Sequence, residues 1–384
     1  MALTGALECL ATAINKFMTQ FGAYLNTDSD GNMCWSPPGI FSLLSLLYDS
    51  ASGGIAEKLA ILLNVENTEA AIADCEMLTN LLITFTDLTF VHGSAIFVKD
   101  IEVIGKDFIK NAGKFYDTTI LPLQYDKKGR AYKSINAWVE NKPTGKIEES
   151  FISNDFKQNL QLMILSGCYW RADWLEKFEY YEVKKDVFTV SDKETIRCRM
   201  IKLQCAARYA DRDDISAQLL CIPFKDPRCG FLMILPRPRI SLKEVERKML
   251  GKDLHYIYER LRTSPMVVSL PKLRAESTID LRSTLTKLGY TELFDGNGAF
   301  RGIFQINSRF KVDGFLQKIV VETGEKGTKP PKIETVKNAN TPAAPNVPQN
   351  RSAFNANRPF MFYIIYHDRK SFFPLVVGRV VKPV

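Results

Sequence analysis

Apolar residues near the N-terminus recur at intervals of three and four, the spacing of a helix that buries one face. This pattern predicts a helix over residues 4–23 that packs Leu10, Ile14 and Phe17 on a core. A second helix is expected after Trp35-Ser-Pro-Pro-Gly, because proline fits the first helical turn, and it should be buried because it is apolar nearly all round. Further helices are expected over residues 66–83, 107–116, 130–140, 242–262 and 278–288.

Runs rich in β-branched and aromatic residues predict the strands. The run over residues 160–170 is mostly apolar, which suits a sheet that is covered on both faces. Helices and strands follow one another without regular βαβ alternation, which favours the α+β class. The remaining strands are expected over residues 88–98, 217–223, 230–235, 266–270, 315–321, 360–366 and 373–381.

A long polar stretch, residues 325–358, separates two of these apolar runs. It contains five prolines and almost no aromatic residues, so it buries too little apolar surface to offset the entropy of ordering it. Loops of this length inside a compact protein are usually functional or are linkers. Only twenty-six residues follow Arg358, too few for a core of their own. We therefore expect one domain, residues 1–384, that displays the loop.

Composition indicates an ordinary soluble globular protein, with 46% hydrophobic residues and a net charge of +8. No run is apolar and long enough for a membrane span, and no signal peptide is recognised. The chain is accordingly expected to be cytoplasmic or secreted by a non-classical route, or extracellular if it is a mature form. Its eight cysteines lie in apolar or mixed contexts without a CxxC pair, so buried free thiols are expected.

Catalytic chemistry is not expected. The three histidines, His92, His255 and His367, lie in no recognisable catalytic or metal-binding spacing, and GxSxG, HExxH and phosphate-loop motifs are absent from the sequence. His92 sits in a predicted strand and is interpreted as a core or edge histidine. The sequence therefore predicts no enzyme, no metal site and no cofactor.

Nine short motifs, in their order along the chain, resemble the serpin family over essentially its whole length. Each motif alone is weak, and their order carries the resemblance. The matching blocks are Trp35-Ser-Pro, Ile135-Asn-Ala-Trp-Val, Thr144-Gly-Lys-Ile, Trp170-Arg-Ala-Asp-Trp with Phe178, Leu270-Pro-Lys-Leu, the Leu281, Leu285, Leu288-Gly and Phe294 pattern, Glu325-Lys-Gly-Thr, Arg358-Pro-Phe, and Gly378-Arg-Val-Val-Lys-Pro.

This resemblance implies the serpin fold, with three β-sheets and about nine helices in one metastable domain. It also implies the inhibitory mechanism of the family. An endopeptidase attacks the exposed loop and forms an acyl-enzyme, and the cut loop then inserts as a strand into the main sheet and distorts the protease.

The hinge of the loop departs from the family pattern. Glu325, Gly327 and Thr328 match the hinge, but small residues should follow, whereas this chain continues Lys329-Pro330-Pro331-Lys332. Proline removes ladder donors and is found at sheet edges or bulges, and alternate residues would point Pro330 and Lys332 inward with Thr328. We predict that insertion past Thr328 is slow or incomplete. The chain would then act as a binding or interaction protein; the alternative is a working suicide-substrate inhibitor of a serine or cysteine endopeptidase.

The sheet-opening region that the resemblance implies comprises Ser36, Gly39, Ser166, Trp174 and Gln317. Ser36 matches the family, but Gly39, Ser166 and Gln317 stand where the family has Ser, Asn and His. These changes are expected to remove hydrogen-bonding groups where the sheet must part, unless other groups compensate.

The scissile bond is ambiguous. In the family, the scissile bond lies at a usual distance from the hinge and from the strand that follows the loop. Counted forward from Gly327, that spacing gives Thr341-Pro342, whereas counted back from Pro359 it gives Pro348-Gln349. The two counts disagree, so this loop is longer than is usual in the family. Trypsin-type alternatives are the bonds Lys337-Asn338 and Arg351-Ser352.

Partners are less constrained by the sequence. A target endopeptidase or another protein is expected, with the chain a monomer and without nucleic-acid or membrane binding. Weak polyanion binding stays open at the basic stretches 126–133 and 243–262, although residues 65–98 contain no Lys or Arg.

Overall fold

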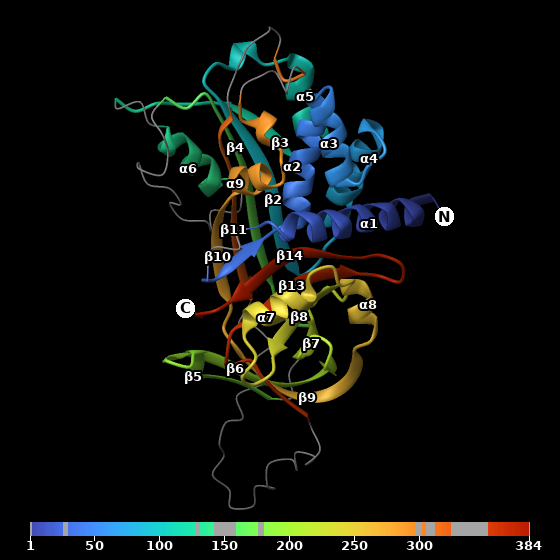
Figure 1. Ribbon diagram of the computed structural model, residues 1–384, viewed down its shortest axis with the longest axis vertical. Coiled ribbons are helices and arrows are strands. Elements are labelled where there is room, and N and C mark those ends of the chain that lie inside the picture. Colours follow the sequence, from blue (N-terminus) through green and yellow to red (C-terminus); the bar gives the residue numbers. More distant parts are fainter. Residues whose placement is uncertain are drawn as a thin grey trace, which may run out of the picture.

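The computed structural model describes residues 2–25, 30–127, 131–141, 159–175, 180–295, 302–304, 312–323 and 352–383. In these ranges the helices gather mainly around one end of an elongated molecule (Figure 1). They are α1 (Ala2–Gly22), α2 (Pro37–Ser50), α3 (Gly54–Leu63), α4 (Thr68–Leu82), α5 (Lys106–Phe115), α6 (Tyr132–Asn141), α7 (Leu242–Met249), α8 (Leu254–Glu259) and α9 (Leu281–Lys287), with short 3-10 helices at Ile101–Val103 and Thr291–Leu293.

A five-stranded sheet has the spatial order β10-β11-β4-β2-β3. Its two central neighbours, β4 and β11, run parallel, with Val312 opposite Leu162 at one end and Thr323 opposite Ala172 at the other. Each also pairs with an antiparallel neighbour on its other side, β2 for β4 and β10 for β11. The strands are β2 (Leu88–Val98), β3 (Thr118–Pro122), β4 (Leu162–Ala172), β10 (Arg274–Asp280) and β11 (Val312–Thr323).

Successive side chains along the strands of this sheet point alternately into two different hydrophobic clusters, one on each face. Ile164 and Ile319 belong to the large core that includes α2, whereas Met163 and Val320 pack with Trp138 of α6 on the opposite face. Gly167 allows this approach, because a Cβ there would lie 3.2 Å from the Trp138 ring. Helices thus cover both faces, as the apolar run over residues 160–170 predicted.

A nine-stranded sheet follows the order β1-β14-β13-β8-β7-β6-β9-β12, with β5 pairing on β6. The 19-residue strand β6 pairs with β9 and β5 in its first part and with β7 near its end, so it joins two of the three expected sheets into one. The strands are β1 (Met33–Trp35), β5 (Tyr180–Ser191), β6 (Glu194–Arg212), β7 (Ala217–Pro223), β8 (Cys229–Pro236), β9 (Arg262–Pro271), β12 (Ser352–Asn355), β13 (Phe360–His367) and β14 (Phe372–Val380).

The prediction of a single helix over residues 242–262 is wrong. The charged run over residues 242–262 is broken into α7 and α8, because Gly251 adopts a left-handed φ of +72° and Asp253 caps a new helix start. The helix expected from residue 278 begins only at Leu281, since the preceding residues form β10. The α+β class and the strand over residues 88–98 are confirmed.

Candidate functional site

Ser36 stands where β1 meets α2 and is fully buried. The Gly39 N–H donates to the Ser36 hydroxyl oxygen at 3.3 Å, which satisfies one of the unpaired amides of the first helical turn. The same hydroxyl donates to the carbonyl of Leu375 in β14 at 2.9 Å. Ser36 therefore ties the start of α2 to the nine-stranded sheet. The sequence did not predict this contact, because the acceptor is a backbone carbonyl and does not depend on the side chain of Leu375.

Gln317 of β11 joins this cap to the five-stranded sheet. Its Oε1 accepts from the Ser36 N–H at 2.8 Å, and its Nε2 donates to the Ser36 carbonyl at 3.3 Å. Nε2 also lies 3.4 Å from the hydroxyl of Ser166 in β4, to which it donates. All three residues have no exposed surface. We call Ser36, Gly39, Ser166 and Gln317 the shutter cluster.

Gly39 completes the shutter cluster by leaving space. A Cβ at this position would lie 3.2 Å from Gln317 Nε2 and 3.3 Å from the Ser166 hydroxyl oxygen. A serine there would crowd the amide, so the small residue and the long glutamine fit together. Gln317 spans the distance from β11 to both α2 and β4 and forms hydrogen bonds to Ser36 and Ser166.

Trp174 lies apart from the shutter cluster. It follows β4, forms a β-bridge with Phe224, and stacks on the Phe224 ring with a centroid distance of 5.0 Å. Ser166 lies eight residues earlier in the same stretch, about 25 Å away at the rise of an extended strand. Of the five predicted sheet-opening residues, four are therefore brought together and Trp174 is not.

Two thiols lie beside the shutter cluster. Burial raises the pKa of Cys34 to about 12, and burial likewise raises the pKa of Cys168 well above the ordinary value. A thiol with so high a pKa stays protonated and unreactive. All eight cysteines are free, and seven of them are buried, whereas Cys9 is exposed. The prediction of buried free thiols is confirmed for all but Cys9.

The α2-facing side of the β4 and β11 pair is buried. Directly opposite pairs on this side are Gln317 with Ser166, Ile319 with Cys168, and Val321 with Trp170. Every one of these residues is at most 1% exposed. Apart from the Gln317 and Ser166 pair, this surface is apolar.

The ends of the long loop belong to different sheets. β11 ends at Thr323 in the five-stranded sheet, and β12 begins at Ser352, parallel to β9 in the nine-stranded sheet. Arg358 follows β12, and its Nε donates to the Pro236 carbonyl at 2.8 Å. The remaining loop residues lie outside the described part of the chain: Glu325, Gly327, Thr328, Lys329, Pro330, Pro331, Lys332, Lys337, Asn338, Thr341, Pro342, Pro348, Gln349 and Arg351.

Three of the six Lys and Arg residues over 243–262 pair with acidic neighbours. Lys243 pairs with Asp30 at 2.6 Å, Lys248 with Glu244 at 2.7 Å, and Lys252 with Asp214 at 3.1 Å. Exposed pairs of this kind are typical of a solvated helix face. The other basic stretch, 126–133, lies partly outside the described residues.

Two further observations concern other kinds of site. His92 is buried in β2 beside the Phe90 ring, with the two ring centroids 6.1 Å apart. Among the described residues, no group of His, Cys, Asp and Glu has the geometry of a metal site. None of the helices there combines the length and the apolar character that crossing a membrane requires.

Comparison with known proteins agrees with this architecture. A family profile described as "Serpin (serine protease inhibitor)" matches residues 12–383. The chain is 23% identical to human Serpin I2, covering 98% of this chain and 93% of that one. It is 24% identical to the leukocyte elastase inhibitor of Xenopus laevis, covering 98% and 100%. The crystal structure of Serpin48, a highly specific serpin of the insect Tenebrio molitor, superposes with a TM-score of 0.80 at 24% identity and covers 98% of both chains.

The chain therefore belongs to the serpin family, whose members are generally protease inhibitors. In this chain the five-stranded sheet contains the directly paired neighbours β4 and β11, and residues 324–351 connect β11 to β12.

Proposed function

We propose that this serpin presents its loop to endopeptidases as a substrate but inserts it slowly or incompletely past Thr328, and that it acts mainly by binding another protein. The observation that carries the proposal is the apolar, fully buried α2-facing side of the β4 and β11 pair. A strand that enters between them becomes central. It must then present backbone donors on both edges and small or apolar side chains inward.

The direction of insertion follows from the sheet. β11 leads into the loop at Thr323, so a loop that folds back beside β11 runs antiparallel to it and also to β4. Antiparallel pairing is slightly stronger per residue than the parallel pairing that it would replace. The sheet itself thus favours insertion, and the sequence of the hinge decides how far it proceeds.

If the loop turns back directly after β11, the register of the inserted strand against β11 is fixed, and this register determines which side chains come into contact. If residues 324–327 form the turn, residues on β11 and on the inserted strand pair with their side chains on the same face. Lys332 would then enter between Ile319 and Cys168, and Glu334 would enter the shutter cluster. The expected pairs on the α2 side are Thr328 with Thr323, Pro330 with Val321, Lys332 with Ile319, and Glu334 with Gln317.

These pairs oppose insertion for two reasons. Pro330 and Pro331 each lack the N–H that a central strand needs on both edges. The ammonium of Lys332 would lie beside Ile319, where an unpaired charge costs several kcal/mol. The Thr328 position itself meets no such obstacle, so insertion is expected to stop after it.

A gain-of-function experiment tests the proposal. The wild type and the variant Pro330→Ala/Pro331→Ala/Lys332→Ala/Glu334→Ala, which also removes the carboxylate that would enter the shutter cluster, are incubated with trypsin, elastase, chymotrypsin and a papain-like protease. We expect the wild type to be cut without an SDS-stable adduct and without a rise in Tm. The variant should gain on the order of 10 °C in Tm after cleavage, because its loop completes the sheet. The control Pro345→Ala removes a proline that lies beyond the hinge and in none of the candidate scissile bonds, and it should behave as the wild type does.

A working inhibitor is the second candidate, and the complete shutter cluster favours it. Gln317 forms hydrogen bonds to Ser36 at the start of α2 and to Ser166 of β4, so the buried polar groups where the sheet would part are paired. An SDS-stable adduct of the wild type, together with a large rise in Tm on cleavage, would establish this candidate and contradict the hinge argument. The target would then be an endopeptidase whose specificity matches one of the loop bonds.

A further inference from the structure

Two neighbouring helices, α4 and α5, carry opposite charge on their exposed sides. They lie beside each other, because the Asn111 side chain of α5 is hydrogen-bonded to Asp49 of α2, and Glu69 of α4 acts electrostatically on the same carboxylate. Figure 1 shows both helices at the end of the molecule opposite β5 and β9. The long loop leads into β12, which pairs with β9 at that other end, so the inference below does not depend on how the loop behaves.

The exposed side of α4 carries the acidic charge. Residues three and four apart lie above one another on a helix, so five positions form one line along α4 and its last turn. We call this line the glutamate stripe, and each of its members is exposed: Glu69, Ala73, Glu76, Asn80 and Ile83. Residues 65–98 contain no lysine or arginine, so this segment offers the stripe no counter-charge of its own.

The exposed side of α5 carries the basic charge. The same spacing places five exposed residues on one line, which we call the lysine stripe: Lys106, Ile109, Lys110, Gly113 and Lys114. Asp107 is the single acidic residue of this helix, so the three lysines leave an excess of positive charge. The α5 surface is therefore opposite in sign to the α4 surface beside it.

The two stripes do not neutralise each other within one molecule. Among the described residues, neither of the two glutamates and none of the three lysines forms an ion pair or a side-chain hydrogen bond, and Lys114 lies over the Phe115 ring at 4.3 Å. The stripes match in length, because seven residues of helix separate the glutamates by about 10.5 Å and eight residues separate the outer lysines by about 12 Å. Both stripes are thus available to a partner of matching length.

A surface with two complementary stripes side by side is complementary to itself. A two-fold axis along the helices places the glutamate stripe of each copy opposite the lysine stripe of the other. Ile83 and Ile109, which are 77% and 37% exposed, would be covered in such a pair, and Ala73 and Gly113 leave room for close approach. A polyanion would use only the lysine stripe and a basic protein only the glutamate stripe, whereas a second copy of the chain uses both.

We propose that two copies of this chain associate reversibly through α4 and α5, with the glutamate stripe of each copy against the lysine stripe of the other. Two short helices per copy make a small contact, so the dimer is weak and exchanges with the monomer that the sequence predicted. Its contact surface lies at the end of the molecule away from β9 and β12, so both loops of the dimer stay accessible to proteases and to other proteins.

Sedimentation velocity on the intact chain tests the proposal. At about 0.1 M salt the Debye length is about 10 Å, so the overall charge of +8 is screened while contacts between the stripes are not. The mean mass of the wild type should rise toward that of a dimer between about 10 and about 500 μM, and it should fall back at about 1 M salt. Glu69→Lys/Glu76→Lys and Lys110→Glu/Lys114→Glu should each weaken association at least about tenfold, because each sets like charges against one another at both symmetric contacts.

A mixture of the two variants provides the decisive result. Together they should associate as the wild type does, because the reversed stripe of one matches the reversed stripe of the other. The control Lys185→Glu/Lys193→Glu makes the same change of charge in β5 and in the turn that follows it, and it should leave association unchanged, as should cleavage of the loop. A wild type that stays monomeric, or a mixture that does not associate, would overturn the proposal. So would weaker retention of Lys110→Glu/Lys114→Glu on heparin without self-association of the wild type, because a polyanion would then be the partner of the lysine stripe.

Discussion

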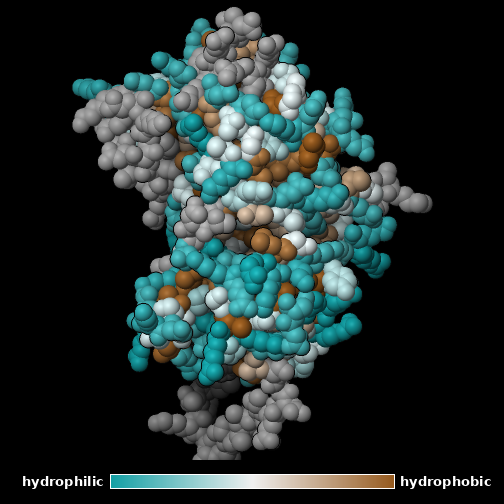
Figure 2. All heavy atoms as spheres, in the orientation of Figure 1, coloured by the Kyte–Doolittle hydropathy of each residue, from teal (hydrophilic) through white to brown (hydrophobic). Residues whose placement is uncertain are grey.

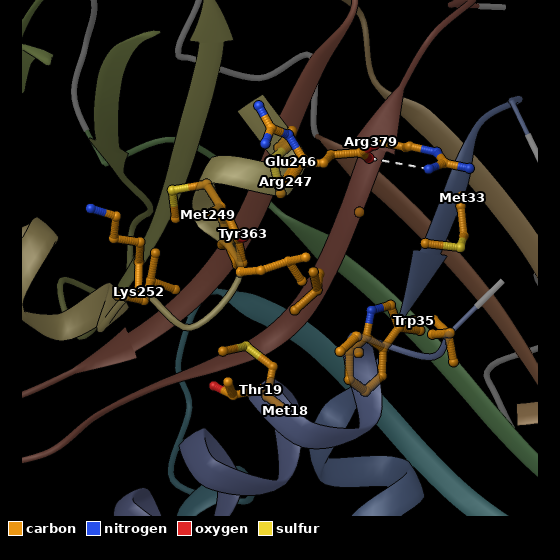
Figure 3. Close-up of a pocket in the computed structure, with 18 of the residues that line it drawn as sticks. Met18, Thr19, Met33, Trp35, Glu246, Arg247, Met249, Lys252, Tyr363 and Arg379 are labelled. Carbon is orange, nitrogen blue, oxygen red and sulfur yellow. Dashed lines mark hydrogen bonds and ion pairs between the residues drawn. The ribbon is translucent and has the colours of Figure 1, made fainter. Parts of the chain in front are cut away.

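Trp35 and Ser36 are neighbours in the sequence, yet they belong to interior regions of opposite character. Ser36 lies in the shutter cluster, where its N–H, carbonyl and hydroxyl all have partners at 2.8 to 3.3 Å. Trp35 lines a cavity of about 370 Å³ between α1, α7, β13 and β14, which is seen as a hydrophobic recess in Figure 2 and close up in Figure 3, and which is here called the methionine cavity because Met18, Met33, Met249 and Met361 line it. The Tyr363 hydroxyl in this cavity has no hydrogen-bond partner among the described residues. One peptide bond therefore separates a fully paired polar cluster from a largely apolar cavity.

The difference indicates what each region is for. A buried network in which every group is paired specifies one arrangement of the elements that it joins, here α2, β4 and β11. Buried groups left unpaired carry a free-energy penalty that a bound molecule can remove. The fold thus joins α2, β4 and β11 by internal hydrogen bonds, while the next residue along the chain lines a cavity in which the Tyr363 hydroxyl has no partner among the described residues.

Among the variants that test the contrast between the two regions, Gln317→Leu should have the largest effect. This change leaves the Ser36 N–H and carbonyl buried without the amide that pairs them, so we expect the free energy of unfolding to fall by about 3 kcal/mol. Urea unfolding followed by tryptophan fluorescence measures it. Gln20→Leu, on the exposed side of α1, serves as control. A loss no larger than that of the control would mean that the shutter cluster does not hold the sheet closed.

A smaller effect is expected from Gly39→Ala. The new methyl group would meet Gln317 Nε2 and the Ser166 hydroxyl at about 3.2 and 3.3 Å, so one neighbour must shift, at about 1 kcal/mol. Removing the Ser166 hydroxyl in the double variant Gly39→Ala/Ser166→Ala should recover part of that loss. A double-mutant cycle on the unfolding free energy provides the test, and strict additivity of the two changes would rule out the contact.

The smallest effect is expected in the methionine cavity. Tyr363→Phe removes a hydroxyl without a partner among the described residues, so stability should change by less than about 0.5 kcal/mol or rise slightly. The matched control is Tyr290→Phe, whose hydroxyl donates to the Lys58 carbonyl at 2.9 Å and whose loss should cost about 1 kcal/mol. Equal losses for the two variants would show that Tyr363 is hydrogen-bonded in solution and would remove the contrast between the two regions.

Local pattern was sufficient for much of the fold. The strand over residues 88–98 and the helix that follows Ser36 were predictable because their apolar periodicity and proline placement act within a few residues. The strands β5 and β6 were missed, because charged residues interrupt their apolar positions and their pairing supplies the order. The helix over residues 242–262 was predicted too long, since its charge pattern continues through Gly251 while the backbone does not.

The site could be predicted only as far as single positions carry a family pattern. Ser36, Gly39, Ser166 and Gln317 were found in this way, but the ability of Gln317 to bridge them depends on the register of β11 against β4. The methionine cavity had no signal in the sequence, because its lining comes from segments near both ends and the middle of the chain. Local periodicity contains no information about the register between distant strands or about which distant segments come into contact.

The position of β13 and β14 inside the nine-stranded sheet has a consequence for any protein whose loop has been cut. Both strands lie on the C-terminal side of the loop, and they are held between β1 and β8 by ladders on either edge. A nick between Thr323 and Ser352 therefore produces two polypeptides that stay assembled, and the short one carries a central part of the core of the long one. The two pieces should migrate as one species in gel filtration and separate only when the protein is unfolded.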